Sequence, residues 1–337
     1  MEASTQKLVQ MMAKQMNYRP KASARALAGG RTHTVGLLFV DTGAGLGHIL
    51  SWYASTFKMI TTMLAERDYF MSLATWSRSH EESEQSDSTL PRMFRESAIE
   101  AALMVRTPSG PLLERTLRQQ HLPLVMIDAA PAPGRITVAV NECRAAELAV
   151  EHLVQLGHRR IVYIPLLLAC EPGPAVIRNA VGPYVAPRLS EYPRGYARAM
   201  VAASLLPSSG WDEPFPDDGY EPFLKRLFAT SDPPTALIVA DDIAAVSAIS
   251  WLPPHGIQVP RDVSVVSLCS LGELSHDMLA NMYPTHGVTC QKNMQEQVAA
   301  IAVEKLMQLI KNPSEPVESV LLDPELVVRG STGPCPG

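Results

Sequence analysis

The sequence predicts a doubly wound α/β protein made of two subdomains. Short runs of continuous apolar character alternate with helical patterns along most of its 337 residues. Such runs are typical of parallel strands, because helices cover both faces of a parallel sheet. A chain of this length with 46% hydrophobic residues has enough apolar side chains for the cores of two domains.

The expected elements begin at residue 35. A strand at 35–40 and a helix at 49–67 are followed by a strand at 69–75 and a helix near 82–96. Five more strands are expected, at residues 101–105, 124–127, 161–164, 236–240 and 263–268. Ligands bind outside the carboxyl ends of the strands in such folds, which places the expected site in the loops after residues 40, 75, 127, 240 and 268.

Two short helices and a basic linker are expected ahead of the first strand. Pro20 ends the first helix, since it lacks an amide hydrogen and disfavours a helical residue before it. Residues 22–28 are typical of a second helix that stops at the glycine pair 29–30. Residues 1–33 carry six Lys and Arg against the single acidic residue Glu2, although the whole chain has a formal charge of −5. This local charge suits an arm that contacts phosphates, while a merely solvated linker is the alternative that charge alone favours.

Composition argues against several classes of protein. No run approaches the roughly eighteen apolar residues of a membrane-spanning helix, and the N-terminus is too polar for a signal peptide. A cytoplasmic protein without membrane contact is therefore expected. The five cysteines are scattered and have no C-x-x-C spacing, which argues against a disulfide framework or a metal site.

Enzyme signatures are absent from the sequence. It contains no G-x-S-x-G, no Walker loop and no G-x-G-x-x-G that opens a helix. The glycine-rich loop at 41–47 looks like a phosphate loop, but its glycines have the wrong spacing for a dinucleotide fingerprint. We therefore expect neither catalysis nor a cofactor.

An ordered series of motifs resembles the LacI/GalR (lactose-repressor/galactose-repressor) family of bacterial transcription regulators. The run Y-x-P-x-x-x-A-R-x-L followed by G-R-T, at residues 18–32, is similar to the hinge of that family. The blocks at 152–161, 195–200, 234–266 and 324–332 are similar to later family motifs, among them H-L-x-x-L-G-H-R-R-I and P-x-L-V-x-R-x-S-T. The resemblance implies two periplasmic-binding-protein-like subdomains with a small effector in the cleft between them.

The resemblance also implies that the hinge binds operator DNA. In the family, the hinge helix folds when the dimer meets its operator, and a leucine from each subunit wedges into the minor groove. Leu27 is the matching residue here. A homodimer is expected, because paired headpieces read pseudo-palindromic operators. The residues expected to contact DNA are Tyr18, Arg19, Lys21, Ala24, Arg25, Leu27 and Arg31.

The start of the sequence departs from the family pattern. Residues 5–16 match the third helix of the family's DNA-binding headpiece, and the helix-turn-helix that normally precedes it is missing from this sequence. Three explanations are open: a deliberately shortened chain, a gene start assigned too late, or a natural protein without direct base reading. We expect a late start or a truncation. A ligand-binding sensor domain that acts alone or through a full-length partner is the alternative function.

The resemblance implies three crossovers between the subdomains, near residues 141–145, 289–291 and 317–322. The expected division of the chain is a headpiece remnant at 1–19, a hinge at 20–33, a first subdomain at 34–142 plus 290–318, a second subdomain at 143–289 plus 319–332, and a tail at 333–337.

The expected effector site differs from that of sugar-binding relatives. Tyr192 stands where they carry an arginine, and Cys269 stands where they carry an aspartate that grips hydroxyls. We expect Asp242 to cap a helix and Asp241 to face the cleft. Trp76, just beyond the predicted strand at 69–75, either stacks on a ligand or packs in the core. The residues expected to contact a sugar-like effector are Asp41, Thr42, Trp76, Tyr192, Asp241 and Cys269.

Overall fold

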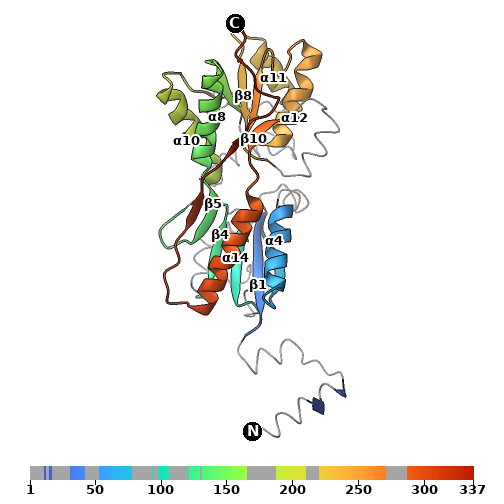
Figure 1. Cartoon of the computed structure of the whole chain (residues 1–337), viewed down its shortest axis with the longest axis vertical. Helices are drawn as coiled ribbons and strands as arrows, with labels where there is room; N and C mark the ends of the chain where they lie inside the picture. Colours follow the sequence, from blue (N-terminus) through green and yellow to red (C-terminus); the bar gives the residue numbers. More distant parts are fainter. Residues whose placement is uncertain are drawn as a thin grey trace.

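The computed structural model of the chain describes residues 11–12, 15–16, 31–41, 53–77, 94, 98–105, 119, 121–129, 131–164, 187–209, 220–270 and 287–337. Within these residues, two six-stranded sheets form two lobes that follow one another along the long axis of the molecule (Figure 1). The predicted hinge helix at 22–28 lies outside the described residues, as does all of the predicted helix near 82–96 except residue 94.

The first sheet takes strands from both halves of the chain. Its order is β11-β5-β4-β3-β1-β2, and every pairing in it is parallel. All five residues of β3 are buried, as expected of a strand that is covered on both faces. The strands are β1 (Thr34–Asp41), β2 (Phe70–Ser77), β3 (Ala101–Val105), β4 (Leu124–Ile127), β5 (Thr137–Val140) and β11 (Val320–Leu322).

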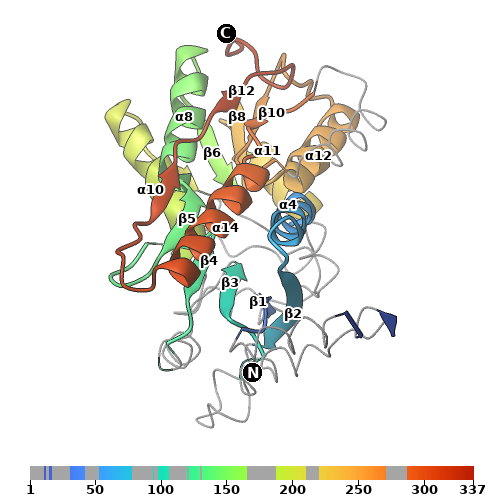
Figure 2. The ribbon, with the colours of Figure 1, turned by 60° about the horizontal axis from the view of Figure 1, so that its bottom comes forward.

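Two helices, α4 (Ala54–Ala65) and α14 (Gln295–Lys311), lie side by side against this sheet (Figure 2). The buried positions of α14 recur at the spacing of an amphipathic helix; they are Val298, Ala299, Ala302, Val303, Leu306 and Met307. These side chains share one apolar core with Ile60 and Leu64 of α4 and with the strand residues below. Helix α14 therefore belongs to the first subdomain, although it lies far from the other elements in the sequence.

The second sheet has the order β12-β10-β9-β8-β6-β7. Its pairings are parallel except for that between β12 and β10, which is antiparallel. The strands are β6 (Ile161–Ile164), β7 (Ser208–Ser209), β8 (Ala236–Val239), β9 (Ser264–Ser267), β10 (Thr289–Gln291) and β12 (Leu326–Val327).

Helices cover both faces of the second sheet. On one face, α8 (Glu142–Gln155) and α10 (Pro187–Ala202) pack with Tyr163, Ile238 and Val266. On the other face, α11 (Tyr220–Phe228) and α12 (Asp242–Trp251) pack with the alternate strand residues, and the short 3-10 helix η2 (Pro253–His255) follows α12. The alternation of the two cores along each strand is the period of two that a β-strand requires.

The chain passes between the two sheets three times, and two of these passages differ from the prediction. Residues 289–291 form β10 of the second sheet, so the passage into α14 comes after them. Residues 320–322 form β11, which pairs with β5 of the first sheet, so the last passage lies between β11 and β12. The physical reason is that backbone groups which lie alongside another strand form ladder hydrogen bonds with it instead of remaining linkers.

The strands expected from continuous apolar runs are confirmed, each to within two residues of its predicted ends. The helix predicted at 49–67 is observed as α4, and residues 49–52 lie outside the described part. Among the described residues, no helix is long and apolar enough to cross a membrane.

Candidate functional site

The carboxyl ends of the two sheets face one another. Strand β5 of the first sheet ends at Val140, and the chain enters α8 of the second subdomain within two residues. Conversely, β10 of the second sheet ends at Gln291, and the chain then enters α14 of the first subdomain. Because the neighbouring strands run parallel to β5 and β10, both sheets direct their carboxyl ends toward the passages in the middle of the molecule (Figure 1). We call the residues that follow these strand ends the inter-sheet site.

Buried acidic side chains collect at these strand ends. Asp128 follows β4, Glu142 follows β5, and Asp241 and Asp242 follow β8. Their exposed fractions are 7%, 5%, 3% and 2%, and they are the only charged Asp, Glu, Lys or Arg side chains among the buried residues that the structure describes. Four buried carboxyl groups therefore follow strand ends at the inter-sheet site.

Asp241, and not Asp242 as predicted, caps the helix that follows β8. Asp241 has an extended backbone (φ −151°, ψ 170°) and caps α12, since its Oδ1 accepts a hydrogen bond from the Ala244 amide at 2.7 Å. Asp242 is already the first helical residue, and its amide donates to the Cys269 carbonyl at 3.2 Å. The prediction that Asp242 is the cap is wrong, because an N-cap needs the non-helical backbone that Asp241 has.

Tyr163 lies in β6 close to this cap. Its side chain is 1% exposed, and burial, followed by the negative charge of Asp241, raises the pKa of its phenol well above the usual range. Within the described residues its hydroxyl has no hydrogen-bond partner. Tyr163 therefore adds a buried polar atom next to the acidic strand ends, one that sequence reasoning missed because a tyrosine inside an apolar strand gives no signal of its own.

The Tyr192 side chain is buried in a core. Its exposed fraction is 7%, its ring belongs to the core between α10 and the second sheet, and its hydroxyl donates to the Leu268 carbonyl at 3.3 Å. It therefore ties α10 to the segment that follows β9. Tyr192 thus contacts the segment that contains Cys269, and the contact of both residues with an effector stays a prediction.

Residues 268–270, which we call the exit segment of β9, contact three other elements. The Leu268 carbonyl accepts from Tyr192 in α10, the Cys269 carbonyl accepts from the Asp242 amide at the start of α12, and the Ser270 carbonyl accepts from Asn293 Nδ2 at 3.0 Å. The Cys269 side chain is half-buried and packs against the core of the first subdomain. The exit segment thus joins the second sheet to the first subdomain.

Several predicted site residues fall wholly or partly outside the described part of the chain. Asp41 ends β1, but nothing is described of its side chain, and Thr42 lies outside. Trp76 lies within β2 opposite Val40, not beyond the strand as predicted, because β2 continues to Ser77. Of the predicted DNA contacts, only Arg31 is described, and it is exposed. The contacts of these residues with effector or DNA remain predictions.

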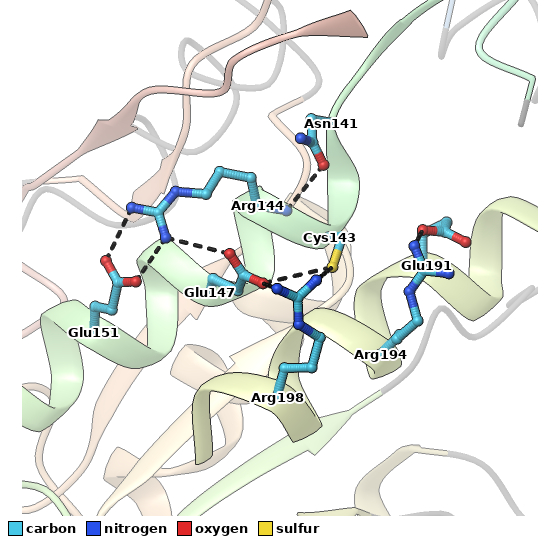
Figure 3. A network of polar contacts seen from close by, with 8 residues as sticks. All are labelled: Asn141, Cys143, Arg144, Glu147, Glu151, Glu191, Arg194 and Arg198. Atoms are coloured by element: carbon cyan, nitrogen blue, oxygen red, sulfur yellow. Dashed lines mark hydrogen bonds and ion pairs between the residues drawn. The ribbon is translucent and has the colours of Figure 1, made fainter. Parts of the chain in front are cut away.

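A charged network holds α10 against α8 (Figure 3). Arg144 binds Glu151 through two hydrogen bonds of 2.6 and 3.1 Å, and it also contacts Glu147 at 3.3 Å. Arg198 of α10 reaches Glu147 at 3.4 Å. Hydrogen bonds to Glu151 raise the pKa of Arg144. The network fixes the helix that carries Tyr192, although surface pairs of this kind contribute little stability each.

The same close-up shows how near the two helices approach. The Cys143 thiol lies 3.5 Å from Arg198 Nη1, and an ion pair joins Glu191 to Arg194 within α10 (Figure 3). A Cβ added at Gly195 would lie 2.0 Å from the carbonyl oxygen of Cys143. Only glycine therefore allows α10 to pack this closely on the first turn of α8.

Hydrogen bonds link the passages between the subdomains to one another. The Asn141 amide donates to the Leu322 carbonyl at 2.9 Å, and the Lys292 amide donates to the Glu325 carbonyl at 2.8 Å. Gln291 Nε2 donates to the Ala145 carbonyl at 2.9 Å in a buried contact. Across the described residues, no three His, Cys, Asp or Glu side chains come together as a metal site.

Two facing doubly wound sheets joined by three passages define a two-lobed ligand-binding fold. The periplasmic binding protein-like domain model matches residues 150–332, more than half of the chain. The chain is 26% identical over 330 residues to the probable HTH-type transcriptional repressor ExuR of Bacillus subtilis (strain 168), a match that covers 97% of this chain and 89% of that protein. It is also 26% identical to the HTH-type transcriptional repressor PurR of Edwardsiella ictaluri (strain 93-146), over 96% of this chain and 86% of that protein.

Solved structures share the fold. The lac repressor dimer bound to operator and the anti-inducer ONPF superposes with a TM-score of 0.70 at 18% identity, over 94% of this chain and 99% of that one. The complex of the transcriptional regulator CelR with cellobiose superposes with a TM-score of 0.66 at 22% identity, over 98% and 91%. The chain belongs to the periplasmic binding protein-like domain family and, within it, to the LacI/GalR transcriptional regulators. It is thus a transcriptional regulator with an effector-binding domain.

Proposed function

We propose that this regulator is a cytoplasmic repressor that binds a sugar or sugar derivative at the inter-sheet site and operator DNA through its N-terminal arm. The observation that carries the ligand part is the set of buried carboxylates at the carboxyl ends of both sheets. Carboxylates accept hydrogen bonds from hydroxyl groups, and ligands of open α/β sheets bind at these strand ends. The CelR complex with cellobiose is a precedent for such a ligand in a protein of this fold.

The charge of the site narrows the class of effector. Asp128, Glu142, Asp241 and Asp242 are acidic, and the buried residues that the structure describes include no Lys or Arg. A ligand carboxylate or phosphate would therefore meet like charge in a partly desolvated site. We propose a neutral or amine-bearing sugar, and not a sugar acid or a sugar phosphate.

The ligand proposal can be tested by thermal unfolding and calorimetry with five sugars. We expect cellobiose, glucose or glucosamine to raise the unfolding temperature, and glucuronate and glucose 6-phosphate to bind at least about tenfold more weakly. Asp241→Asn is the informative variant, because asparagine can still cap α12 but carries no charge. This variant should show a smaller difference between its affinity for glucose and its affinity for glucuronate. Tight binding of glucuronate to the unchanged protein would contradict the proposed ligand class.

Binding to DNA is a separate part of the proposal. The basic residues and Leu27 at positions 18–31 support it, together with the operator complex of the lac repressor. We propose that the chain binds DNA as a homodimer, with one arm from each subunit. Cleft closure would then change the spacing of the two arms, a coupling of typically about 1–3 kcal/mol in allosteric proteins.

Fluorescence anisotropy with a pool of randomised duplex DNA tests this part. Arg25→Ala should lower the slope of affinity against salt by about one, because one phosphate contact is lost. Leu27→Ala should weaken binding and leave that slope unchanged, because an apolar wedge releases no counterion. Lys58→Ala, at an exposed position of α4, is the control. If Arg25→Ala and Leu27→Ala bind DNA as well as the unchanged protein and the control do, the arm does not contact DNA and the sensor-domain alternative is favoured.

We also propose a division of the chain into two subdomains, with the boundaries at the three passages between the sheets. Residues 34–140, 295–311 and 320–322 form the first, and residues 142–291 with 326–327 form the second. Limited proteolysis should cut preferentially outside these two sets of residues.

A further inference from the structure

We propose that Asn293 is the positioning residue that couples the inter-sheet site to the first subdomain. The inference rests on the proposed function, because coupling matters only if the inter-sheet site binds an effector. Asn293 lies between β10 and α14, where the chain passes from the second subdomain to the first. Its side chain makes one hydrogen bond to each subdomain.

The two bonds of Asn293 use opposite ends of one amide group. Nδ2 donates to the Ser270 carbonyl at 3.0 Å, in the exit segment of β9. Oδ1 accepts from the Gln295 amide at 2.9 Å, at the start of α14. The partners fix the orientation of the amide, since a carbonyl can only accept and an amide N–H can only donate. A short side chain that both donates and accepts is required here, and asparagine supplies it.

The partner in the second subdomain is well placed to sense a ligand. The carbonyls of three successive residues, Leu268, Cys269 and Ser270, accept from α10, from the start of α12 and from Asn293 respectively. Leu268 and Ser270 are 1% and 6% exposed, so leaving either carbonyl without its donor would be costly. A ligand that shifts Tyr192 or Asp242 would therefore also shift the Ser270 carbonyl.

The partner in the first subdomain transmits such a shift. Gln295 begins α14, and the first two turns of this helix are buried at Val298, Ala299 and Ala302. Val298 is 2% exposed, and the two alanines are fully buried. Closely packed helices move as rigid units, because their interdigitated side chains resist continuous deformation. Displacement of Asn293 would thus move α14 against α4 and the first sheet.

Other bonds near the passages do not have this property. The contacts of Asn141 with Leu322 and of Lys292 with Glu325 join one passage to another. Gln291 joins β10 to α8, and both belong to the second subdomain. Among these bonds, those of Asn293 alone connect the exit segment of β9 to the start of α14.

Two variants separate coupling from helix capping. Asn293→Asp keeps an oxygen for the Gln295 amide but loses the donor to Ser270. Asn293→Ser also keeps a capping oxygen and, unlike aspartate, adds no charge. Its single hydroxyl oxygen cannot take the places of both Oδ1 and Nδ2, so a hydroxyl that accepts from the Gln295 amide leaves the Ser270 carbonyl without its donor. Asn312→Ser, at the opposite end of α14, is the matched control.

Hydrogen exchange of the whole chain without ligand, read by mass spectrometry, is the measurement. Both Asn293 variants should speed exchange roughly three- to tenfold in peptides covering 264–270 and 287–294, the range expected from losing one net hydrogen bond. Peptides of the α14 interior should stay unchanged, and Asn312→Ser should change neither region. Unchanged exchange at 264–270 would overturn the proposal, and so would acceleration confined to α14, which indicates capping alone.

A double-mutant cycle tests the route through the exit segment. Tyr192→Phe removes the bond to the Leu268 carbonyl on the other side of that segment. Its effect on exchange at 287–294 should be non-additive with that of Asn293→Ser, whereas strict additivity would contradict coupling through residues 268–270. Because no ligand is used, failure of every sugar to bind would count against the proposed function and not against this coupling.

Discussion

Individual side chains that are predicted to face the ligand at the inter-sheet site also have structural roles. Asp241 caps α12, and Tyr192 holds the Leu268 carbonyl from the core between α10 and the second sheet. Their substitution therefore changes folding as well as any binding. Asn293 was not among the residues that sequence reasoning selected, because an asparagine two residues before a helix gives no sequence signal of a contact with the Ser270 carbonyl.

Asp241 offers the clearest stability prediction for a single residue. Asp241→Ala should lower the free energy of unfolding by about 1 kcal/mol, because the Ala244 amide loses its side-chain acceptor. Asp241→Asn should cost much less, since asparagine is an equally good cap. Urea unfolding monitored by circular dichroism measures both. Equal losses for the two variants would show that charge, and not the capping bond, is what matters at this position.

At the scale of elements, strands with continuous apolar runs were predictable and three-residue strands were not. The runs at 101–105, 124–127 and 161–164 match β3, β4 and β6 residue for residue. Strands β10 and β11 have only three residues each and were expected to be crossover linkers. Their pairing depends on which strands lie nearby, and a local pattern carries no information about that.

Contacts between helices that lie far apart in the sequence were likewise beyond prediction. The i, i+3 and i+7 spacing of Arg144, Glu147 and Glu151 suggests pairs along α8, and these are observed. The link from Glu147 to Arg198 joins two helices far apart in the sequence, which spacing cannot reveal. The roles of Tyr192 and Cys269 depend on the same tertiary approach.

The close contact of α8 and α10 leads to a prediction for Gly195. Gly195→Ala should destabilise the protein by at least about 1–3 kcal/mol, because the new methyl group would overlap the Cys143 carbonyl oxygen unless the helices separate. Denaturant unfolding checks this, with Gly337→Ala as the control, since nothing lies within 4 Å of a Cβ there. An unchanged midpoint for Gly195→Ala would mean that the two helices can shift apart without cost.

At the scale of the whole molecule, a buried polar cluster fastens the C-terminal tail to the second sheet. His158 is fully buried and contacts Thr235 through Nδ1 at 3.0 Å and Ser264 and the Gly333 carbonyl through Nε2 at 2.9 and 3.1 Å. Since the Gly333 carbonyl can only accept, Nε2 carries the proton and Nδ1 accepts from Thr235. The neutral ring suits this arrangement.

Stability should therefore depend on pH near the usual histidine range. Burial lowers the pKa of His158, and burial also lowers that of the neighbouring His152. The unfolded chain then binds protons more readily than the folded chain, so stability is complete above pH ~6.5 and declines as pH falls below it. Each histidine contributes a slope of at most about 1.4 kcal/mol per pH unit.

Unfolding temperatures measured between pH 7.5 and 5.5 test this dependence. The unchanged protein should lose stability steadily over the lower half of that range, and His158→Gln should show a shallower decline from a lower starting value. A decline of the same steepness in both proteins would assign the effect to other groups.

The insertion of the second subdomain within the first has a consequence for synthesis on the ribosome. The first five strands of the first sheet emerge by residue 140, but α14 and β11 follow only after roughly 150 to 180 further residues. At bacterial translation rates of about 5–20 residues per second, that sheet waits roughly ten to forty seconds for its last helix and strand. Meanwhile the nascent chain exposes an apolar face and an unpaired β5 edge, which makes the first subdomain a natural client of ribosome-associated chaperones.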